Sequence, residues 1–325
     1  MSLAAKVLQG DVQAAARLIS LIEDEAPEAL KEMESIYPHT GKAYIVGVTG
    51  APGVGKSTLT DNLIGLFRKQ NMTVGVIAID PTSALTGGAL LGDRVRMQRH
   101  SADSGVFIRS LATRGWAGGL AKAAIGAVHV MDAMGKEIII METVGSGQVE
   151  IDIVKAADTT LLVLAPGAGD EIQTMKAGII ESADIIAINK ADREGADRLE
   201  TDLASMLAMK ARHEGEWLPP VVLTEAVNDK GTDELGTAIL KHREHLKNSG
   251  GLPLRRRERA KLELLETVDG LIKDTVHNFD GGEYLEKIVD EMQKGKTNPY
   301  RAAQEITERI ASNFSRVKNR GNHGL

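Results

Sequence analysis

A glycine-rich octapeptide, Gly50–Ser57, restricts the fold of this chain more than any other feature. Its sequence is Gly-Ala-Pro-Gly-Val-Gly-Lys-Ser, and it follows the apolar run Ala43–Thr49 and leads into the helix-forming run Ser57–Gln70. A phosphate-binding P-loop requires this strand–loop–helix setting. Glycines let the backbone wrap closely around phosphate oxygens, and the start of the following helix favours negative charge. We therefore predict that the octapeptide binds nucleotide phosphates.

Two residues of the loop are expected to act on the reacting phosphates. Lys56 would reach the β- and γ-phosphates as the main fixed positive charge, so we also assign it a catalytic role. The Ser57 hydroxyl would ligate Mg²⁺. Both count as nucleotide contacts, and the other predicted contacts from this part of the chain are Gly50, Pro52, Gly53, Val54, Gly55 and Thr58.

The middle of the chain alternates between short apolar runs and helix-forming segments. The apolar runs are Ala43–Thr49, Val74–Asp80, Ile138–Glu142, Thr160–Ala165, Asp184–Asn189 and Pro220–Leu223. Runs without polar alternation are typical of strands buried on both faces. Helical stretches such as Ser57–Gln70 and Gly119–Met134 lie between them. The pattern predicts an α/β fold with a doubly wound, mostly parallel sheet.

Both ends of the chain carry apolar residues at helical spacing instead. The stripe near the N-terminus consists of Val12, Ala15, Ala16, Ile19 and Ile22, and the C-terminal stripe of Leu262, Leu265, Val268, Ile272 and Val276. The turn Gly250–Pro253 marks a boundary. We predict an N-terminal helical extension (1–40), a P-loop domain (41–250) and a C-terminal helical arm (251–325). The arm stripe packs either on the protein's own sheet or on a second copy of the chain.

A second motif, Asn189-Lys190-Ala191-Asp192, follows a later apolar run. A carboxylate here can accept hydrogen bonds from guanine N1–H and the exocyclic amine, so Asp192 is expected to select guanine over adenine. The Lys190 stem would lie over the base, and the Asn189 amide would contact N7 and tie neighbouring loops together. Behind a P-loop, this short motif strongly indicates a guanine nucleotide. The predicted base contacts are Asn189, Lys190, Asp192, Glu225 and Ala226.

Acidic residues at strand ends are candidates for the metal site. Asp80 and Glu142 end apolar runs, and Asp93 lies in a glycine-rich segment. Ligands of Mg²⁺, or residues that support them, belong at strand ends beside a phosphate loop. The predicted metal ligands are Ser57, Asp80, Asp93 and Glu142, and Glu142 is also assigned a catalytic role.

The segment after Glu142 resembles a nucleotide-sensing switch. Gly145 is predicted to offer its N–H to the γ-phosphate, so that loss of this phosphate releases the loop. Ras-type enzymes place a water-orienting glutamine directly after this glycine, whereas this chain has Ser146, and Gln148 follows at a different spacing. We therefore expect slow intrinsic hydrolysis that improves when a partner orders the loops.

Composition limits the remaining options. The chain has 325 residues, no cysteine, and 39 Lys+Arg against 45 Asp+Glu, for a net charge of −6. Disulfides and thiolate chemistry are therefore excluded, and the negative balance argues against a protein that mainly coats nucleic acid or anionic membrane. The sequence shows no apolar run of the ~18–20 residues that a membrane span needs and no targeting pattern, so we expect a cytoplasmic protein.

These motifs together resemble the methylmalonyl-CoA mutase-associated G proteins, the MeaB/ArgK type within the SIMIBI class of P-loop GTPases. Besides the phosphate loop and the Asn189–Asp192 motif, the resemblance rests on Asp80–Ser83, Leu91–Arg94, Glu142–Gly145 and Pro166–Gln173. It covers most of the chain. The chain departs from the family pattern at Trp116-Ala117, Ser146, Val149 and Glu225.

The resemblance implies a Mg²⁺-dependent hydrolase of GTP to GDP and phosphate that forms homodimers through its C-terminal arm. Such proteins are chaperones for an adenosylcobalamin-dependent acyl-CoA mutase, and they gate cofactor delivery and protect the mutase. A cobalamin adenosyltransferase is a further candidate partner. In the family, the acids matching Asp80, Asp93 and Glu142 lie around the metal, and the segment matching Gly167–Lys176 senses the mutase.

Two other functions stay open from the sequence. A GTPase metallochaperone for nickel enzymes would need metal ligands, and the only close histidine pair, His242 and His245, is more typical of a solvated helix face. A kinase acting on a transport-binding protein would need ATP, against which Asn189–Asp192 argues. The arginine run Arg255–Arg259 is interpreted as a solvated or intersubunit face. Arg109 either faces phosphate or a partner, or forms an ordinary salt bridge, and the same holds for Arg114.

Overall fold

The computed structural model describes residues 1–80, 98–100, 102–112, 119–143, 156–167, 177–209 and 215–321. The chain forms two compact units, Met1–Ala260 and Lys261–Leu325, which are described separately. None of the helices in these described ranges is long and apolar enough to cross a membrane.

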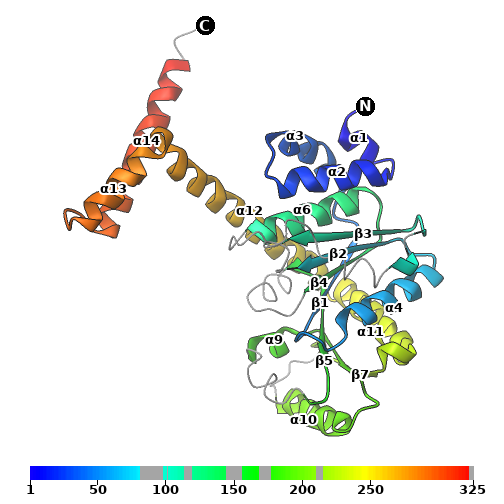
Figure 1. Cartoon of the computed structure of the whole chain (residues 1–325). Coiled ribbons are helices and arrows are strands. Elements are labelled where there is room, and N and C mark those ends of the chain that lie inside the picture. Colours follow the sequence, from blue (N-terminus) through cyan, green and yellow to red (C-terminus); the bar gives the residue numbers. More distant parts are fainter. Residues whose placement is uncertain are drawn as a thin grey trace. The chain divides into compact units, whose positions relative to one another are not determined.

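The first unit is built on a seven-stranded sheet (Figure 1). The strands are β1 (Tyr44–Thr49), β2 (Val74–Asp80), β3 (Val106–Ala112), β4 (Ile138–Thr143), β5 (Thr159–Leu164), β6 (Ile185–Asn189) and β7 (Val221–Thr224). Their order is β3-β2-β4-β1-β5-β6-β7, and every neighbouring pair is parallel. The prediction of a doubly wound parallel sheet is confirmed. The sheet extends in both directions from β1, so the loop after β1 lies where the winding direction changes.

Helices cover both faces of this sheet. Those of the first unit are α1 (Leu3–Val7), α2 (Val12–Glu23), α3 (Pro27–Ile36), α4 (Lys56–Lys69), α6 (Gly119–Ala133), α9 (Ala177–Ser182), α10 (Ala196–Met209) and α11 (Thr232–Asn248), with short 3-10 turns η1 (Tyr37–His39), η3 (Gln98–His100) and η4 (Ala226–Asn228). Helices α4 and α11 contact each other, while α2 packs on α6 (Figure 1). The N-terminal helices are therefore part of the same unit as the sheet.

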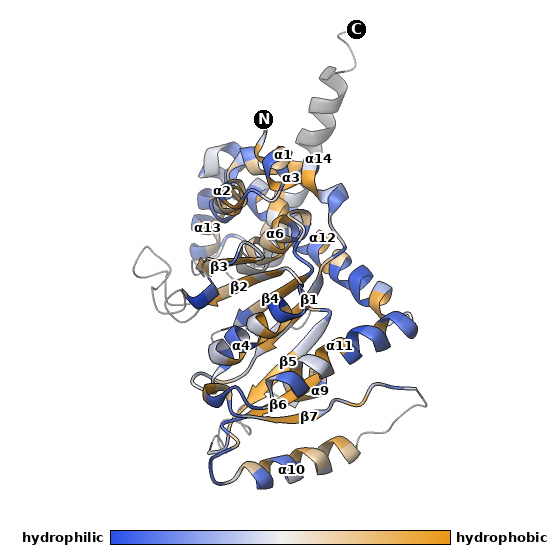
Figure 2. Ribbon diagram, turned by 90° about the vertical axis from the view of Figure 1, so that its right-hand side faces the viewer, coloured by the Kyte–Doolittle hydropathy of each residue, from blue (hydrophilic) through white to orange (hydrophobic). Residues whose placement is uncertain are grey.

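The core explains why the strands are continuous apolar runs. Along β1, Ile45 belongs to the cluster that includes α2 and α6, whereas Val46 and Val48 belong to the cluster that includes α4. Every residue of β1, β4, β5 and β6 is buried. Figure 2 shows β5 and β6 in the orange of hydrophobic residues. Both faces of each central strand are thus covered, and no polar alternation survives.

Strand β3 is the one strand that the sequence analysis did not identify. Its apolar run is interrupted by Arg109, whose Nη2 lies 2.5 Å from Glu23 Oε2 and 2.9 Å from Ser20 Oγ on α2. Both partners of the ion pair are mostly buried. Of the two readings for Arg109, the salt bridge is the one that the structure shows, and it holds an N-terminal helix on the sheet. Arg114 lies outside the described residues.

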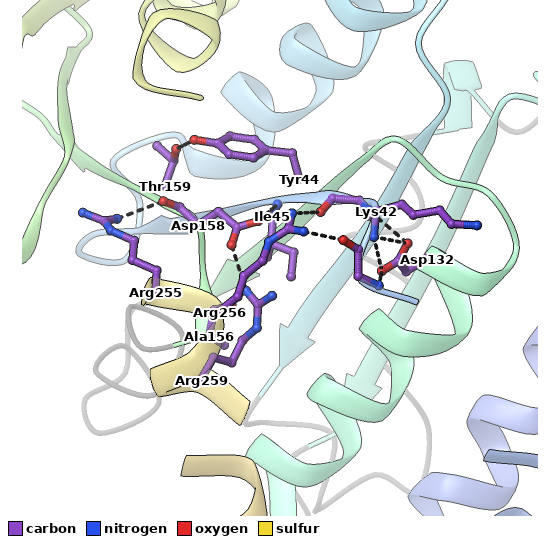
Figure 3. A network of polar contacts seen from close by, with 12 residues as sticks. Lys42, Tyr44, Ile45, Asp132, Ala156, Asp158, Thr159, Arg255, Arg256 and Arg259 are labelled. Carbon is purple, nitrogen blue, oxygen red and sulfur yellow. Dashed lines mark hydrogen bonds and ion pairs between the residues drawn. The ribbon is translucent and has the colours of Figure 1, made fainter. Parts of the chain in front are cut away.

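Three arginines at the start of α12 (Gly251–Asn278), Arg255, Arg256 and Arg259, bond to the sheet, so the interpretation of the run as a solvated face was wrong for these three. Arg257 is exposed. Figure 3 shows Asp158, at the start of β5, surrounded by the three bonded arginines. Its carboxylate, fully buried, accepts bonds from the Ile45 N–H at 3.0 Å and from Arg259 Nη1 at 3.0 Å, with Arg256 Nη2 at 3.5 Å. Arg255 forms a two-bond pair with Asp184, at 2.7 Å each. The root of α12, residues 251–260, is therefore bonded to the sheet within the first unit.

His242 also departs from the expected solvated helix face. It is fully buried on α11, and its Nδ1 lies 2.8 Å from Thr159 Oγ1. Its ring packs on Trp217 with 4.8 Å between ring centroids. Burial lowers the pKa of His242 to about 4, against the opposing effect of nearby Asp184. The side chain is therefore a neutral component of the core.

The loop that enters β1 is held from two sides. Asp132 on α6 accepts hydrogen bonds from three successive backbone N–H groups, at 2.5 Å from Gly41, 3.2 Å from Lys42 and 3.0 Å from Ala43. Arg256 donates to the Gly41 and Ala43 carbonyl groups. These contacts fix the position at which the chain enters its central strand.

All regular secondary structure in the described part of the second unit is helical. After α12 come η5 (Phe279–Gly282), α13 (Glu283–Gln293) and α14 (Pro299–Gly321). A small core forms from Tyr284, Ile288 and Ala302. Helix α12 has no buried residue, and its exposed apolar side chains are Leu254, Leu264, Leu265, Val268, Leu271 and Ile272. The predicted turn at 250–253 is instead the beginning of α12, with Pro253 in the first turn, where its missing N–H costs little.

Candidate functional site

A cavity of about 590 Å³ opens at the carboxyl ends of the strands. Its size is within the usual range of small-molecule sites. It is lined by Pro52, Gly53, Gly55, Lys56, Ser57, Thr58, Ala78, Ile79, Glu142, Thr143, Asn189, Lys190, Asp192, Arg193, Glu225, Ala226, Val227 and Asn228. The cavity thus brings together four segments that the sequence analysis singled out separately: the octapeptide after β1, the end of β4, the loop after β6 and the loop after β7.

Two glycines of the octapeptide have no room for a side chain. Gly50 has φ +143°, and a Cβ there would lie 2.1 Å from the Val163 carbonyl oxygen on β5. Gly55 has φ +102°, and a Cβ there would lie 2.2 Å from Asn189 Nδ2. Glycine is therefore required at both positions by backbone conformation and by space. The tight loop also brings the phosphate and base motifs into contact.

Lys56 begins helix α4 and is almost completely buried. Its Nζ donates to the Gly50 carbonyl at 2.6 Å and to the Ala51 carbonyl at 2.9 Å. The ammonium group is therefore held against the loop backbone at the wall of the cavity. Val54 is buried, and neither it nor Gly50 lines the cavity with the other predicted loop contacts.

Two oxygen-bearing side chains meet on the cavity wall next to Lys56. Ser57 Oγ lies 2.5 Å from Glu142 Oε1, which reaches it from the end of β4. A hydroxyl and a carboxylate are hard oxygen ligands of the kind that Mg²⁺ prefers. Residues of this type at this place fit a magnesium ion. Asp80 is the last residue of β2, while Asp93 and Gly145 lie outside the described residues.

Asn189 ties three parts of the site together. Its Nδ2 donates to the Val54 carbonyl at 2.7 Å, and its Oδ1 accepts from the Ala226 N–H at 3.0 Å and from Thr224 Oγ1 at 3.2 Å. The side chain is buried. Of the two tasks predicted for this amide, the structure displays the linking of neighbouring loops.

Two other residues of this motif, Lys190 and Asp192, also line the cavity. Lys190 has a left-handed backbone, with φ +58°, and its Nζ donates to the Gly53 carbonyl at 2.7 Å. Its side chain therefore extends back to the phosphate loop. Asp192 is exposed and lines the cavity, so its carboxylate is accessible to a ligand.

Glu225 is used within its own loop. Its carboxylate accepts hydrogen bonds from Asn228 Nδ2 at 2.9 Å and from Lys230 Nζ at 3.0 Å, and these bonds lower its pKa. Backbone hydrogen bonds also join Glu225 and Lys230. The Glu225 side chain therefore shapes the loop, while Ala226 is held by Asn189.

A comparison with known protein families shows to which family this chain belongs. The family model described as methylmalonyl Co-A mutase-associated GTPase MeaB matches residues 15–280. The chain belongs to the MeaB family of GTPases. The family resemblance stated from the motifs is confirmed, and so is the prediction of a GTP-hydrolysing enzyme, which implies binding of GTP and GDP.

Individual relatives match nearly the whole chain. A Pyrococcus abyssi protein whose name places it among candidate GTPases is 53% identical over 308 residues, or 94% of this chain and 95% of that protein. GTPase ArgK of Escherichia coli is 30% identical over 319 residues, or 95% and 96%. The solved structure titled LAO/AO transport system kinase matches with a TM-score of 0.66 at 25% identity, covering 95% of this chain and 96% of that one.

Six residues that line the cavity were missed by sequence reasoning for this MeaB-family GTPase: Ala78, Ile79, Thr143, Arg193, Val227 and Asn228. Val227 is 90% exposed, although it is apolar. A flat aromatic base could cover such a side chain. The available signal was adjacency, because each of the six lies within two positions of a predicted site residue.

Proposed function

We propose that this MeaB-family GTPase binds GTP and Mg²⁺ in the cavity at the end of the sheet, with the phosphates on Gly50–Ser57 and guanine at Asp192. The observation that carries the proposal is the convergence of the two motifs on one cavity of about 590 Å³. The Ser57–Glu142 contact lies on its wall between β1 and β4. A nucleotide that spans the cavity would contact the residues proposed to bind its phosphates, its metal ion and its base at the same time.

The roles proposed for the residues around the phosphates follow from their charges. Lys56 offsets the negative charge of the β- and γ-phosphates, and Ser57 with Glu142 holds the metal that neutralises the rest. Asp80 and Asp93 are proposed as further metal-site residues, and the Gly145 N–H as a contact to the γ-phosphate. When bound, Mg²⁺ would supply positive charge that stabilises the negative charge of the transition state.

Base selection would reside in the exposed carboxylate of Asp192. Guanine presents two N–H donors on one edge, and adenine presents neither to a carboxylate placed there. A site built to bond a donor rejects an analogue that lacks it, because its own polar group would be left without a partner. We propose slow intrinsic hydrolysis because the residue after Gly145 is Ser146 rather than a glutamine that could orient the attacking water.

The partner proposed is an adenosylcobalamin-dependent acyl-CoA mutase, for which this GTPase would act as a chaperone. The name of the matched family, methylmalonyl Co-A mutase-associated, supports it. A cobalamin adenosyltransferase is a second proposed partner. A cytoplasmic location, without nucleic acid or membrane partners, is proposed on charge and composition.

A homodimer is proposed through α12. This helix has no buried residue, yet it exposes a row of leucines and other apolar side chains, including Leu264 at 63% and Leu265 at 55% exposed. An exposed apolar stripe of this kind marks an interaction surface. A second copy offers the same stripe, which is the arrangement of a two-fold symmetric interface.

Light scattering after size-exclusion chromatography tests both associations. The chain alone, of 34.8 kDa, should elute with twice that mass. The double variant Leu265→Glu/Ile272→Glu should elute as a monomer, whereas the control Leu30→Glu, at another exposed apolar position, should remain dimeric.

Added methylmalonyl-CoA mutase from the host organism should co-elute, with an amount that differs between GDP and a non-hydrolysable GTP analogue. A monomeric parent, or a mutase that never co-elutes, would remove the corresponding association.

A kinase function is the second candidate, because the structure matched over nearly its full length is titled a transport system kinase. It would require adenine nucleotide in the same cavity. Nickel delivery is the third candidate, but His242 is buried against Thr159 and Trp217, so this histidine is not available to a metal at the surface. The GTPase and kinase proposals require different nucleotides, so the relative affinity for guanine and adenine nucleotides distinguishes them.

A further inference from the structure

A buried amide on α4, Asn62, joins two segments that lie far away in the sequence. Its Nδ2 donates to the Ala226 carbonyl at 2.8 Å, in the loop after β7. Its Oδ1 accepts from Arg99 Nη2 at 2.9 Å, in the 3-10 turn η3. Asn62 is 7% exposed, so its bond to Ala226 is buried, whereas its bond to Arg99 is partly buried. Asn62 does not line the nucleotide cavity.

Arg99 itself is fixed by a second residue of α4. Its Nε lies 2.6 Å from Asp61 Oδ2, and the Asp61 side chain is 12% exposed. His100 Nε2 also lies 3.1 Å from Asp61 Oδ1. Arg99 is therefore held beside α4 by an ion pair, in addition to its bond to Asn62. The guanidinium can only donate, so it always faces the oxygen of the Asn62 amide.

This contact determines which way the Asn62 amide points. If the amide turned over, its NH₂ would face the Arg99 guanidinium and its oxygen would face the Ala226 carbonyl, and neither pair can form a hydrogen bond. Arg99 and the Ala226 carbonyl thus demand the same orientation from opposite ends. The pair Asp61–Arg99 therefore aims the Asn62 donor at the base-side loop.

Ala226 is in turn the point where the base-side loop meets the guanine motif. Its carbonyl is bonded by Asn62 and its N–H by Asn189 Oδ1, at 3.0 Å. Asn189 continues to the Val54 carbonyl in the phosphate loop. A continuous chain of hydrogen bonds thus runs through Arg99, Asn62, Ala226, Asn189 and Val54.

We propose that Asn62, oriented by Arg99, is a positioning residue for the base of the nucleotide. It acts through Ala226, whose neighbours Val227 and Asn228 line the cavity. The proposal rests on the base site proposed above. Losing the Asn62 amide removes the bond that ties the Ala226 carbonyl to α4 and leaves that carbonyl only the Asp229 N–H of its own loop, at 3.3 Å. The loop is then held less firmly and must be ordered again each time a base binds. The phosphate end keeps its own contacts.

The expected signature is a loss confined to ligands that carry the base. Asn62→Ala should weaken GDP binding about 10-fold and raise KM for GTP similarly, while kcat stays within about 2-fold. Pyrophosphate, which reaches only the phosphate loop, should bind within about 2-fold of the parent. A general loss of stability would not separate these two ligands. The control Asn248→Ala, at the exposed end of α11, should change neither.

Three further single variants and one double variant identify the hydrogen bonds involved. Asn62→Asp keeps the acceptor for Arg99 but lacks the donor to Ala226, so it should lose GDP affinity as Asn62→Ala does. Arg99→Gln should give a smaller loss of about 3-fold, and Arg99→Lys should restore part of it. The combination of Asn62→Ala with Arg99→Gln should be no worse than Asn62→Ala alone, because Arg99 acts through the amide.

Calorimetric titration of all variants with GDP and pyrophosphate decides the matter. Equal losses for both ligands, unchanged GDP affinity in Asn62→Ala, or fully additive losses in the double variant would overturn the proposal. Arg99 is half exposed, so its variants supply the test even if Asn62→Ala fails to fold. Asp192→Asn, measured in the same series, distinguishes a failure of the proposed base site from a failure of the role proposed for Asn62. If it too leaves GDP affinity unchanged, the base site is misplaced and the proposal falls with it, whereas a loss in Asp192→Asn alone overturns only the role of Asn62.

Discussion

Replacing Lys56 by alanine should lower GTP turnover by about 10²–10³-fold, the usual cost of removing one preorganised group that stabilises transition-state charge. Lys56 is almost completely buried at the cavity wall, where its Nζ is held by two loop carbonyl groups. Charge fixed in a site of low dielectric interacts more strongly with phosphate than it would in water. Phosphoryl transfer depends mainly on such positioned charge.

The measurement is GTP turnover at saturating GTP and Mg²⁺. Lys31→Ala, on an exposed position of α3, is the matched control and should retain parental turnover. Far-ultraviolet circular dichroism establishes that each variant is folded. A folded Lys56→Ala protein that turns over GTP like the parent would remove this lysine from the site.

Asp158→Ala should reduce the free energy of unfolding of the first unit by about 3–5 kcal/mol, the typical result of removing one partner of a buried ion pair. Asp158 is fully buried, and its carboxylate meets Arg256, Arg259 and the backbone N–H of Ile45 (Figure 3). Without it, positive charge remains at the sheet without compensation. The bonds that fasten the root of α12 would also weaken.

Urea unfolding followed by tryptophan fluorescence measures this loss, because both tryptophans belong to the first unit. The control is Asp202→Ala on α10, where Asp202 lies 3.9 Å from Arg198 with both side chains mostly exposed. Surface pairs of this kind contribute about 0–1 kcal/mol. If the two variants lose the same stability, the arginine network around the buried Asp158 does not fasten α12 as described.

The sheet could be predicted from sequence because burial on both faces leaves a signal that is local to each strand. The run Tyr44–Thr49, for example, is apolar or small throughout, and the octapeptide after it implies a strand and a helix on either side. Strand β3 lacks this signal, because Arg109 interrupts it. The partner that allows the charge to be buried, Glu23, lies 86 positions earlier in the chain.

The same limit applies to the charged groups at the root of α12. A run of arginines suggests solvent, and only the fold brings Asp158 and Asp184 within reach of Arg255 and Arg259. The polar residues of the site were identified from motifs whose spacing is fixed by the nucleotide. Asn62 belongs to no such motif, since its contacts to Arg99 and Ala226 exist only after folding.

The affinity of the unmodified chain for GDP and ADP, measured by calorimetry in Mg²⁺, tests the central claim most directly. If Asp192 reads the base, GDP should bind on the order of 100-fold more tightly than ADP or better. Asp192→Asn should weaken GDP and favour xanthosine diphosphate, whose changed edge can pair with an amide. Equal affinity for GDP and ADP, or tighter binding of ADP, would contradict the guanine site and favour the kinase alternative.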